Sequence, residues 1–88
     1  MGLKVLITGG AGYIGATAVR LLTKQGHEVT AFDNLSQGHR EAVPPQARLV
    51  IADLADRETL STLFKESKFD AVMHFAASAV VGLIAYRP

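Results

Sequence analysis

The chain has 88 residues, of which 49% are hydrophobic and 19% charged, as in a soluble globular domain. Nine basic and eight acidic residues leave a net charge of +1, which gives no electrostatic basis for binding nucleic acid or an acidic membrane. The absence of cysteine excludes disulfides, thiolate metal sites and a cysteine nucleophile, and it fits a cytoplasmic location. No signal peptide or membrane span is expected, because the apolar runs are too short.

Strand-length apolar runs alternate with helical patterns along the first part of the chain. Residues 3–8 are expected to form a strand that is covered on both faces. Residues 13–25 predict a helix closed by Gly26, because apolar residues recur at the spacing of one helix face: Ile14, Ala18, Leu21 and Leu22. Residues 27–33 predict a second strand that ends in Asp33.

The second part of the chain continues this alternation after a loop. Residues 34–47 are expected to be loop, with a single helical turn allowed at residues 40–43, and residues 48–52 predict a third strand. Asp56 is expected to cap a helix whose apolar face contains Leu60, Leu63 and Phe64. Residues 70–75 predict a fourth strand, and the almost wholly apolar residues 78–86 predict a buried helix.

This order of elements predicts an α/β fold in a single domain. The expected architecture is a partial Rossmann-like, doubly wound parallel sheet of about four strands with flanking helices. By analogy with doubly wound folds, the expected strand order is 3-2-1-4.

The strongest functional pattern lies where the first strand meets the first helix. Residues 8–15 read Thr-Gly-Gly-Ala-Gly-Tyr-Ile-Gly and satisfy both G-x-G-x-x-G and the looser T-G-x-x-G-x-x-G. Glycine lets the backbone turn sharply and approach a pyrophosphate, and the helix N-terminus offers free N–H groups to that anion. The bare motif also occurs in glycine turns of unrelated folds, so its context decides its meaning.

Asp33 supplies that context. It ends the second strand 18 residues beyond Gly15, near the spacing expected for a ribose-binding acid. A carboxylate there accepts hydrogen bonds from the ribose hydroxyls and repels a 2′-phosphate, and no arginine follows immediately. The expected cofactor is therefore NAD rather than NADP.

Four stretches together resemble the UDP-galactose (UDP-glucose) 4-epimerases of the extended short-chain dehydrogenase/reductase family. They are residues 8–15, residues 33–39 (Asp-Asn-Leu-Ser-Gln-Gly-His), Asp53-Leu54, and residues 74–77 (His-Phe-Ala-Ala). The resemblance covers nearly the whole chain, and the stretch at 33–39 is its most particular part. Sugar-nucleotide dehydratases and related epimerases are the nearest alternatives. Residues 1–88 would then be the N-terminal half of an NAD-binding Rossmann domain, without the substrate domain.

The resemblance implies a binding role for each matched position. The pyrophosphate would lie on the glycine-rich loop, and the adenosine ribose beside Asp33 and Asn34, with Ser36 either near the ribose or simply a turn residue. Adenine would be bordered by Asp53 and Leu54, and the path to the nicotinamide ribose by the residues after the fourth strand. The expected cofactor-binding residues are Gly9, Gly12, Tyr13, Ile14, Gly15, Asp33, Asn34, Asp53, Leu54, Phe75, Ala76 and Ala77.

The family's catalytic pair is not encoded in these residues. It requires Tyr-x-x-x-Lys, whereas Tyr13 is followed four positions later by Thr17, and Tyr86 lies two residues before the last residue. We therefore expect no catalytic residue and no catalysis by these residues alone, although the resemblance implies NAD and, in a full-length enzyme, a UDP-sugar as ligands. No metal site is expected, since His27, His39 and His74 are scattered, and His74 is expected to pack in the core.

A competing interpretation is a structural fragment that assembles with itself. A fourth strand without a fifth would leave one sheet edge open, and open edges pair with other chains. This predicts a homodimer or larger assembly through the edge of the fourth strand.

Overall fold

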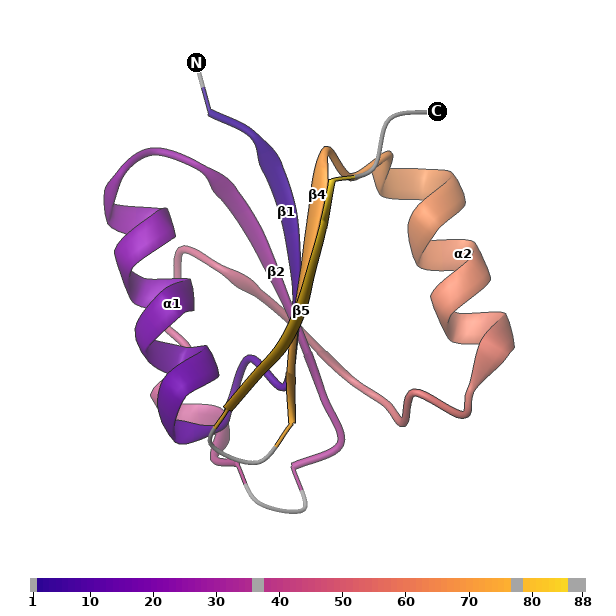
Figure 1. Ribbon diagram of the computed structural model, residues 1–88, viewed down its shortest axis with the longest axis horizontal. Coiled ribbons are helices and arrows are strands. Elements are labelled where there is room, and N and C mark those ends of the chain that lie inside the picture. The colour runs from indigo at the N-terminus through magenta and orange to yellow at the C-terminus, as the bar shows by residue number, and fades with distance from the viewer. Residues whose placement is uncertain (1, 36–37, 77–78, 86–88) are drawn as a thin grey trace.

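A computed structural model describes residues 2–35, 38–76 and 79–85 of the chain. The elements follow in the order β1 (Lys4–Thr8), α1 (Tyr13–Lys24), β2 (Glu28–Asp33), η1 (Arg40–Ala42), β3 (Arg48–Ile51), α2 (Arg57–Ser67), β4 (Ala71–Ala76) and β5 (Ala79–Ala85). Helix α1 covers one face of the sheet and α2 the other (Figure 1). The expected doubly wound arrangement is therefore confirmed. No helix in these described ranges is long and apolar enough to cross a membrane.

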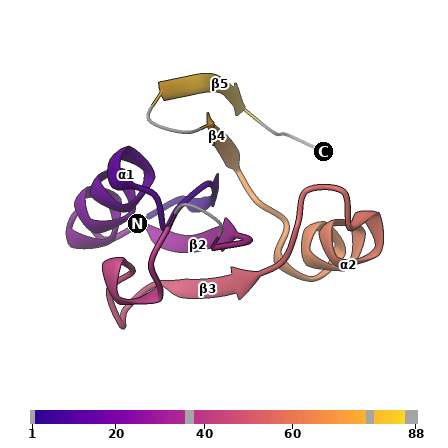
Figure 2. The same cartoon turned by 90° about the horizontal axis from the view of Figure 1, so that it is seen from below.

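The sheet has five strands, and the four that are parallel follow the predicted order, β3-β2-β1-β4. Strand β1 is central, and its register pairs Thr8 with Phe32 of β2 on one side and with His74 of β4 on the other. Figure 2 views this sheet from the edge where the parallel strands end. Parallel strands bring their carboxyl ends to one edge, so the loops after β1, β2 and β3 are neighbours there.

The alternation of side chains along β1 builds two apolar cores. Val5 and Ile7 face α1 and pack with Val19, whereas Leu6 faces α2 and packs with Leu63. All five side chains are buried. The fourth strand follows the same alternation, with Met73 and Phe75 in the α1 core and Val72 in the α2 core. Both faces of the sheet are therefore covered, as predicted for residues 3–8.

The helix ends follow the local sequence. Gly26, which follows the C-cap Gln25 of α1, has φ +93°, and this confirms the predicted left-handed closure. Helix α2 begins after Asp56, whose carboxylate accepts the Thr59 N–H at 3.1 Å and the Thr59 hydroxyl at 2.6 Å. The predicted N-cap is therefore confirmed.

Acid is expected to weaken this cap. Hydrogen bonds from the Thr59 hydroxyl and N–H hold the pKa of Asp56 below its usual value of 3.8. Because the folded-state pKa is the lower one, the cap's contribution is complete above the usual value and is lost as pH falls through the folded-state value. As the pH decreases, the free energy of unfolding in urea should fall more steeply for the wild type than for Asp56→Asn, since asparagine still caps but does not titrate. Parallel pH curves for the two proteins would contradict this.

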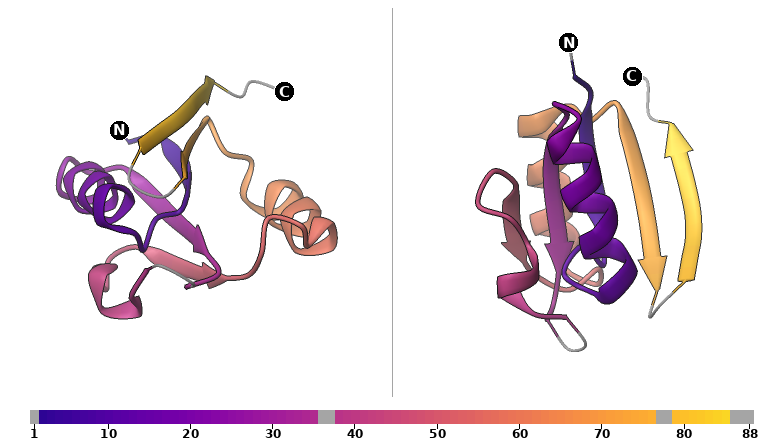
Figure 3. Two further views of the ribbon diagram at one scale, coloured as in Figure 1. Left: turned by 60° about the horizontal axis from the view of Figure 1, so that its bottom comes forward. Right: turned by 90° about the vertical axis from the view of Figure 1, so that its left-hand side faces the viewer.

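The last described segment differs from the prediction. Residues 79–85 form strand β5, antiparallel to β4, so the predicted helix at 78–86 is wrong (Figure 3). A short apolar run does not distinguish a buried helix from a strand by periodicity, and the β-branched content of Ala-Val-Val-Gly-Leu-Ile-Ala favours the strand. The parts of that prediction at Ser78 and Tyr86 lie outside the described residues.

Strand β5 also removes the open edge that was predicted for the fourth strand. β4 pairs with β1 on one side and with β5 on the other, with a register shift between His74 and Phe75. A dimer through an exposed edge of β4 is therefore excluded in this structure. The outer strands of the described sheet are β3 and β5.

Candidate functional site

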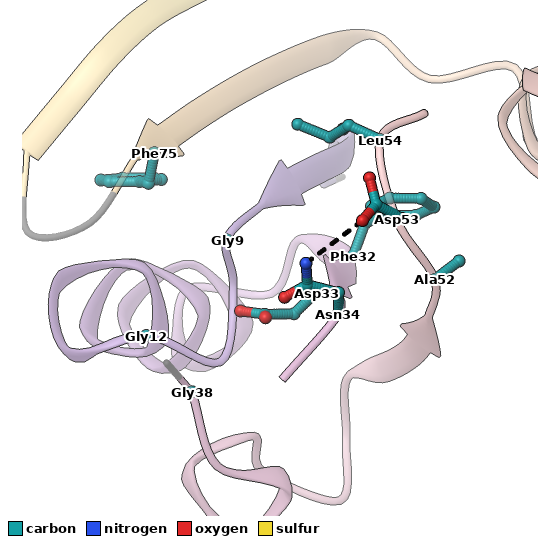
Figure 4. A pocket seen from close by; sticks show the side chains of 10 residues that line it. All are labelled: Gly9, Gly12, Phe32, Asp33, Asn34, Gly38, Ala52, Asp53, Leu54 and Phe75. Atoms are coloured by element: carbon teal, nitrogen blue, oxygen red, sulfur yellow. Dashed lines mark hydrogen bonds between the residues drawn. The ribbon is translucent and has the colours of Figure 1, made fainter. Parts of the chain in front are cut away.

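A cavity of about 310 Å³ lies at the edge where the parallel strands end. Its volume is at the lower end of the range typical of ligand pockets, roughly 300–1,000 Å³. It is lined by Gly9, Gly12, Phe32, Asp33, Asn34, Gly38, Ala52, Asp53, Leu54 and Phe75. Figure 4 shows Asp53 and Leu54 on one side of Gly9 and Phe75 on the other, as the strand order requires.

The glycine-rich loop crosses the cavity between β1 and α1. Gly9 turns the chain with φ +73°, and its N–H donates to the carbonyl of Phe32 at 2.7 Å. The N–H of Gly12 then donates to the carbonyl of Gly9 at 3.1 Å, which closes the loop. A side chain at Gly9 would lie 2.7 Å from the Phe75 carbonyl oxygen, so the loop can lie against β4 only with glycine there.

Helix α1 points its N-terminus at this loop. Its N-cap is Gly12, which offers no side-chain hydrogen bond, and its first turn contains no acidic residue. The first turn of an α-helix leaves backbone N–H groups without partners inside the helix, and these groups attract anions. This end of α1 is therefore chemically suited to a phosphate.

Asp33 connects the end of β2 to the glycine-rich loop. Its side chain is 9% exposed, and one carboxylate oxygen accepts the N–H of Ala11 at 2.9 Å while the other accepts the N–H of Leu35 at 2.7 Å. The N–H of His39 donates to the carbonyl of Ala11 at 3.0 Å, so the loop after β2 returns to the same residue. Each carboxylate oxygen has a second lone pair with which it can accept from a ligand hydroxyl.

Asp53 lies on the far side of the pocket, in the turn between β3 and α2. It is exposed, and one oxygen accepts the N–H of Ala55 at 2.9 Å. The other lies 3.5 Å from the side-chain nitrogen of Asn34, a long contact that joins the ends of β2 and β3. Acceptors are thus available along the wall formed by these two strands.

Seven of the predicted site residues line this cavity together: Gly9, Gly12, Asp33, Asn34, Asp53, Leu54 and Phe75. Gly15 is buried behind the loop, Ile14 packs into the α1 core, and the Tyr13 side chain is 86% exposed. These three can face the loop only through their backbone. Ala76 ends β4, whereas Ala77 and Ser36 lie outside the described residues.

Three lining residues were not predicted: Phe32, Gly38 and Ala52. Phe32 and Ala52 directly precede Asp33 and Asp53, so their positions at the ends of predicted strands could have identified them as lining residues. Gly38 reaches the pocket because its loop folds back onto Ala11, and no local sequence pattern predicts this course of the loop. Within the described part of the chain, no three potential metal-ligating side chains come together.

Comparison with known proteins gives consistent matches over nearly the whole chain. The model of the NAD dependent epimerase/dehydratase family matches residues 5–88. UDP-glucose 4-epimerase of Corynebacterium glutamicum is 45% identical over 86 residues, which are 98% of this chain and 26% of that protein. UDP-arabinose 4-epimerase 1 of Arabidopsis thaliana is 47% identical over 89% of this chain and 21% of its own length.

Solved structures show the same similarity. UDP-glucose 4-epimerase from Brucella ovis in complex with NAD superposes with a TM-score of 0.80 at 41% identity, over 89% of this chain and 24% of that one. The Thermus thermophilus UDP-glucose 4-epimerase complex with NAD gives a TM-score of 0.80 at 43% identity, over 88% and 25%. The chain spans about a quarter of the length of these relatives.

Proposed function

Since this chain belongs to the NAD dependent epimerase/dehydratase family, we propose that residues 1–88 are the N-terminal half of an NAD-binding Rossmann domain. The observation that carries the proposal is the hydrogen bond between the Asp33 carboxylate and the Ala11 N–H. This bond holds Asp33, which is expected to bind the ribose, against the glycine-rich loop, which is expected to bind the pyrophosphate. These two parts of a dinucleotide are adjacent, so their binding groups have to be adjacent as well.

The donors and acceptors around the cavity fit such a ligand. The open N-terminus of α1 suits the pyrophosphate, which would lie on Gly9, Gly12 and the backbone of residues 13–15. Asp33 and Asn34 would bind the adenosine ribose. Asp53 would accept from the exocyclic amine of adenine, with Leu54 packing beside the ring.

The nicotinamide half has fewer groups in this chain. Phe75, which is 5% exposed, is the lining residue on the β4 side of Gly9, and Ala76 and Ala77 follow it in sequence. We propose that these three residues border the path toward the nicotinamide ribose. Because most of the assigned groups serve the adenosine half, that half should supply most of the affinity.

The purified chain is expected to bind NAD saturably in a calorimetric titration. ADP-ribose and ADP should compete nearly as well as NAD, because they keep the adenosine half. NADP should bind more weakly, because its 2′-phosphate would meet the carboxylate of Asp33. Flat heats at millimolar NAD, with the chain shown to be folded, would contradict the proposal.

In a longer protein we propose that this module serves a UDP-sugar 4-epimerase, with UDP-glucose and UDP-galactose as the substrate pair. By their names, the similar relatives are 4-epimerases of UDP-glucose or of UDP-arabinose, and their sequence identities to this chain are comparable. The comparison therefore supports 4-epimerisation more strongly than it supports any one sugar. A related sugar-nucleotide dehydratase or epimerase is the alternative. Residues 1–88 contain no Tyr-x-x-x-Lys, so we propose that the proton-transfer pair lies outside them and that they do not catalyse alone.

Self-assembly without a ligand function is the second candidate. A homodimer or larger species stays a prediction, and it would have to use a surface other than the edge of β4, which is paired on both sides. A monodisperse monomer in sedimentation at tens of micromolar would contradict it. A cytoplasmic location likewise stays a prediction from the amino-acid composition.

A further inference from the structure

The end of β1 is joined to the end of β4 by one pair of side chains. The hydroxyl of Thr8 and the imidazole Nδ1 of His74 are hydrogen-bonded across the two strands. The register places these residues opposite each other, on the face of the sheet that packs against α2. Thr8 is 4% exposed and His74 is half-buried, so the bond is largely shielded from water.

This pair lies directly beneath the glycine-rich loop. Thr8 is the last residue before Gly9, where the chain leaves the sheet, and His74 is the last residue before Phe75, which lines the cavity. A Cβ at Gly9 would stand 3.2 Å from the Cβ of Phe75, so these two residues also touch. Thr8 at the end of β1 and Gly9 at the start of the loop are thus held against two consecutive residues of β4.

The register shift in β4 gives this contact added importance. The shift falls between His74 and Phe75, so the pairing of β4 with β5 changes just where the cavity wall begins. Such an irregularity locally disrupts the ladder of hydrogen bonds between the two strands. The bond from Thr8 to His74 holds β4 from the other side, next to the irregularity.

We infer that His74 is a positioning residue that, through Thr8, holds the start of the glycine-rich loop against the β4 wall of the cofactor site. This inference rests on the proposed binding of NAD. His74 itself is not among the lining residues of the cavity and acts through its neighbours. The hydroxyl can donate to Nδ1 or accept from it, so either tautomer of the neutral ring makes the bond.

The alternative is that the pair only satisfies a buried hydroxyl. Removing one partner would then lower the free energy of unfolding without changing the affinity for ligand. A positioning pair predicts a different result, in which affinity falls by more than the folded fraction accounts for. Binding and unfolding therefore have to be measured on the same variants.

The test uses a double-mutant cycle in the 88-residue chain, with calorimetric titration of NAD and urea unfolding in parallel. Thr8→Val and His74→Leu should each weaken NAD binding roughly tenfold, and the double variant should be no weaker than either single one. Thr8→Ser keeps the hydroxyl, and His74→Asn keeps a polar group near the place of Nδ1. Both should stay within about twofold of the wild type.

The outcomes separate this inference from the proposed function. Unchanged NAD affinity in folded Thr8→Val, or strictly additive losses in the double variant, would overturn the positioning role and leave NAD binding intact. If the wild type itself gave no binding, the proposed function would fail first. Should His74→Leu fold poorly, Thr8→Val decides, because valine nearly matches the shape of threonine.

Discussion

Replacing Gly15 by alanine is expected to abolish measurable NAD binding and to destabilise the chain by about 3 kcal/mol. An added Cβ would overlap the carbonyl oxygen of Gly9 and lie 2.8 Å from its carbonyl carbon and 3.1 Å from the Cα of Gly10. These are backbone atoms, so no side chain can rotate away. Either α1 moves off the loop or the loop opens, and both displace the N–H groups expected at the pyrophosphate.

The sign of this effect is what makes the test informative. In an ordinary helix interior, replacing glycine by alanine stabilises by roughly 1 kcal/mol. Thr17→Ala, two residues further along α1, is the matched control, because Thr17 is exposed and its hydroxyl bonds mainly within its own helix. It should change the free energy of unfolding by no more than about 0.5 kcal/mol and leave NAD affinity unchanged. Wild-type binding by Gly15→Ala would show that α1 does not rest on the loop.

Asp33→Asn is expected to weaken NAD binding roughly 30-fold, or by about 2 kcal/mol. Both oxygens of this buried carboxylate accept backbone N–H groups, from Ala11 and Leu35. An asparagine would turn its NH₂ toward one of these donors, leaving that N–H without an acceptor and placing two donors face to face. The loop after β1 and the loop after β2 would then separate.

The same substitution should also reduce discrimination between cofactors. Loss of the negative charge removes the repulsion of a 2′-phosphate, so the ratio of NADP to NAD affinity should rise even as NAD affinity falls. Asp70→Asn is the matched control, because Asp70 also accepts a backbone N–H, from Lys4 at 2.8 Å, but at the opposite end of β1. Calorimetric titration of Asp70→Asn with NAD should give an affinity within about twofold of that of the wild type. An equal loss in both variants would attribute the effect to stability alone.

Much of the candidate site was predictable because parallel strands end at a common edge. Once residues 3–8, 27–33 and 48–52 are recognised as strands, Gly9, Asp33 and Asp53 have to lie near one another. No distance along the chain reveals this, since Asp53 follows Gly9 by 44 residues. The alternation of short apolar runs with helical patterns predicts that these positions are neighbours, and the resemblance to the 4-epimerases implied the binding role of Asp53.

The other features of the fold and the site could not be predicted, because they depend on the course of a loop and on strand pairing, which local sequence does not determine. The return of Gly38 and His39 onto Ala11 is a tertiary contact of a loop, and it brings Gly38 into the cavity. The strand at Ala79–Ala85 depends on the availability of the β4 edge, which a buried-helix interpretation ignores. His74 was expected to be a packed core residue, and its polar partner became visible only when the register of β1 and β4 was known.

The central position of β1 also determines how long one of its edges stays unpaired while the chain is synthesised on the ribosome. Its partner β2 is complete at Asp33, but β4 begins only at Ala71, 38 residues later. At translation rates of roughly 5–20 residues per second, the second edge of β1 waits about 2 to 8 s for its partner. During that interval the nascent chain presents the unpaired backbone of an apolar strand, which readily pairs with other chains. Slowed translation through residues 34–70 would lengthen this exposure and increase the need for a chaperone.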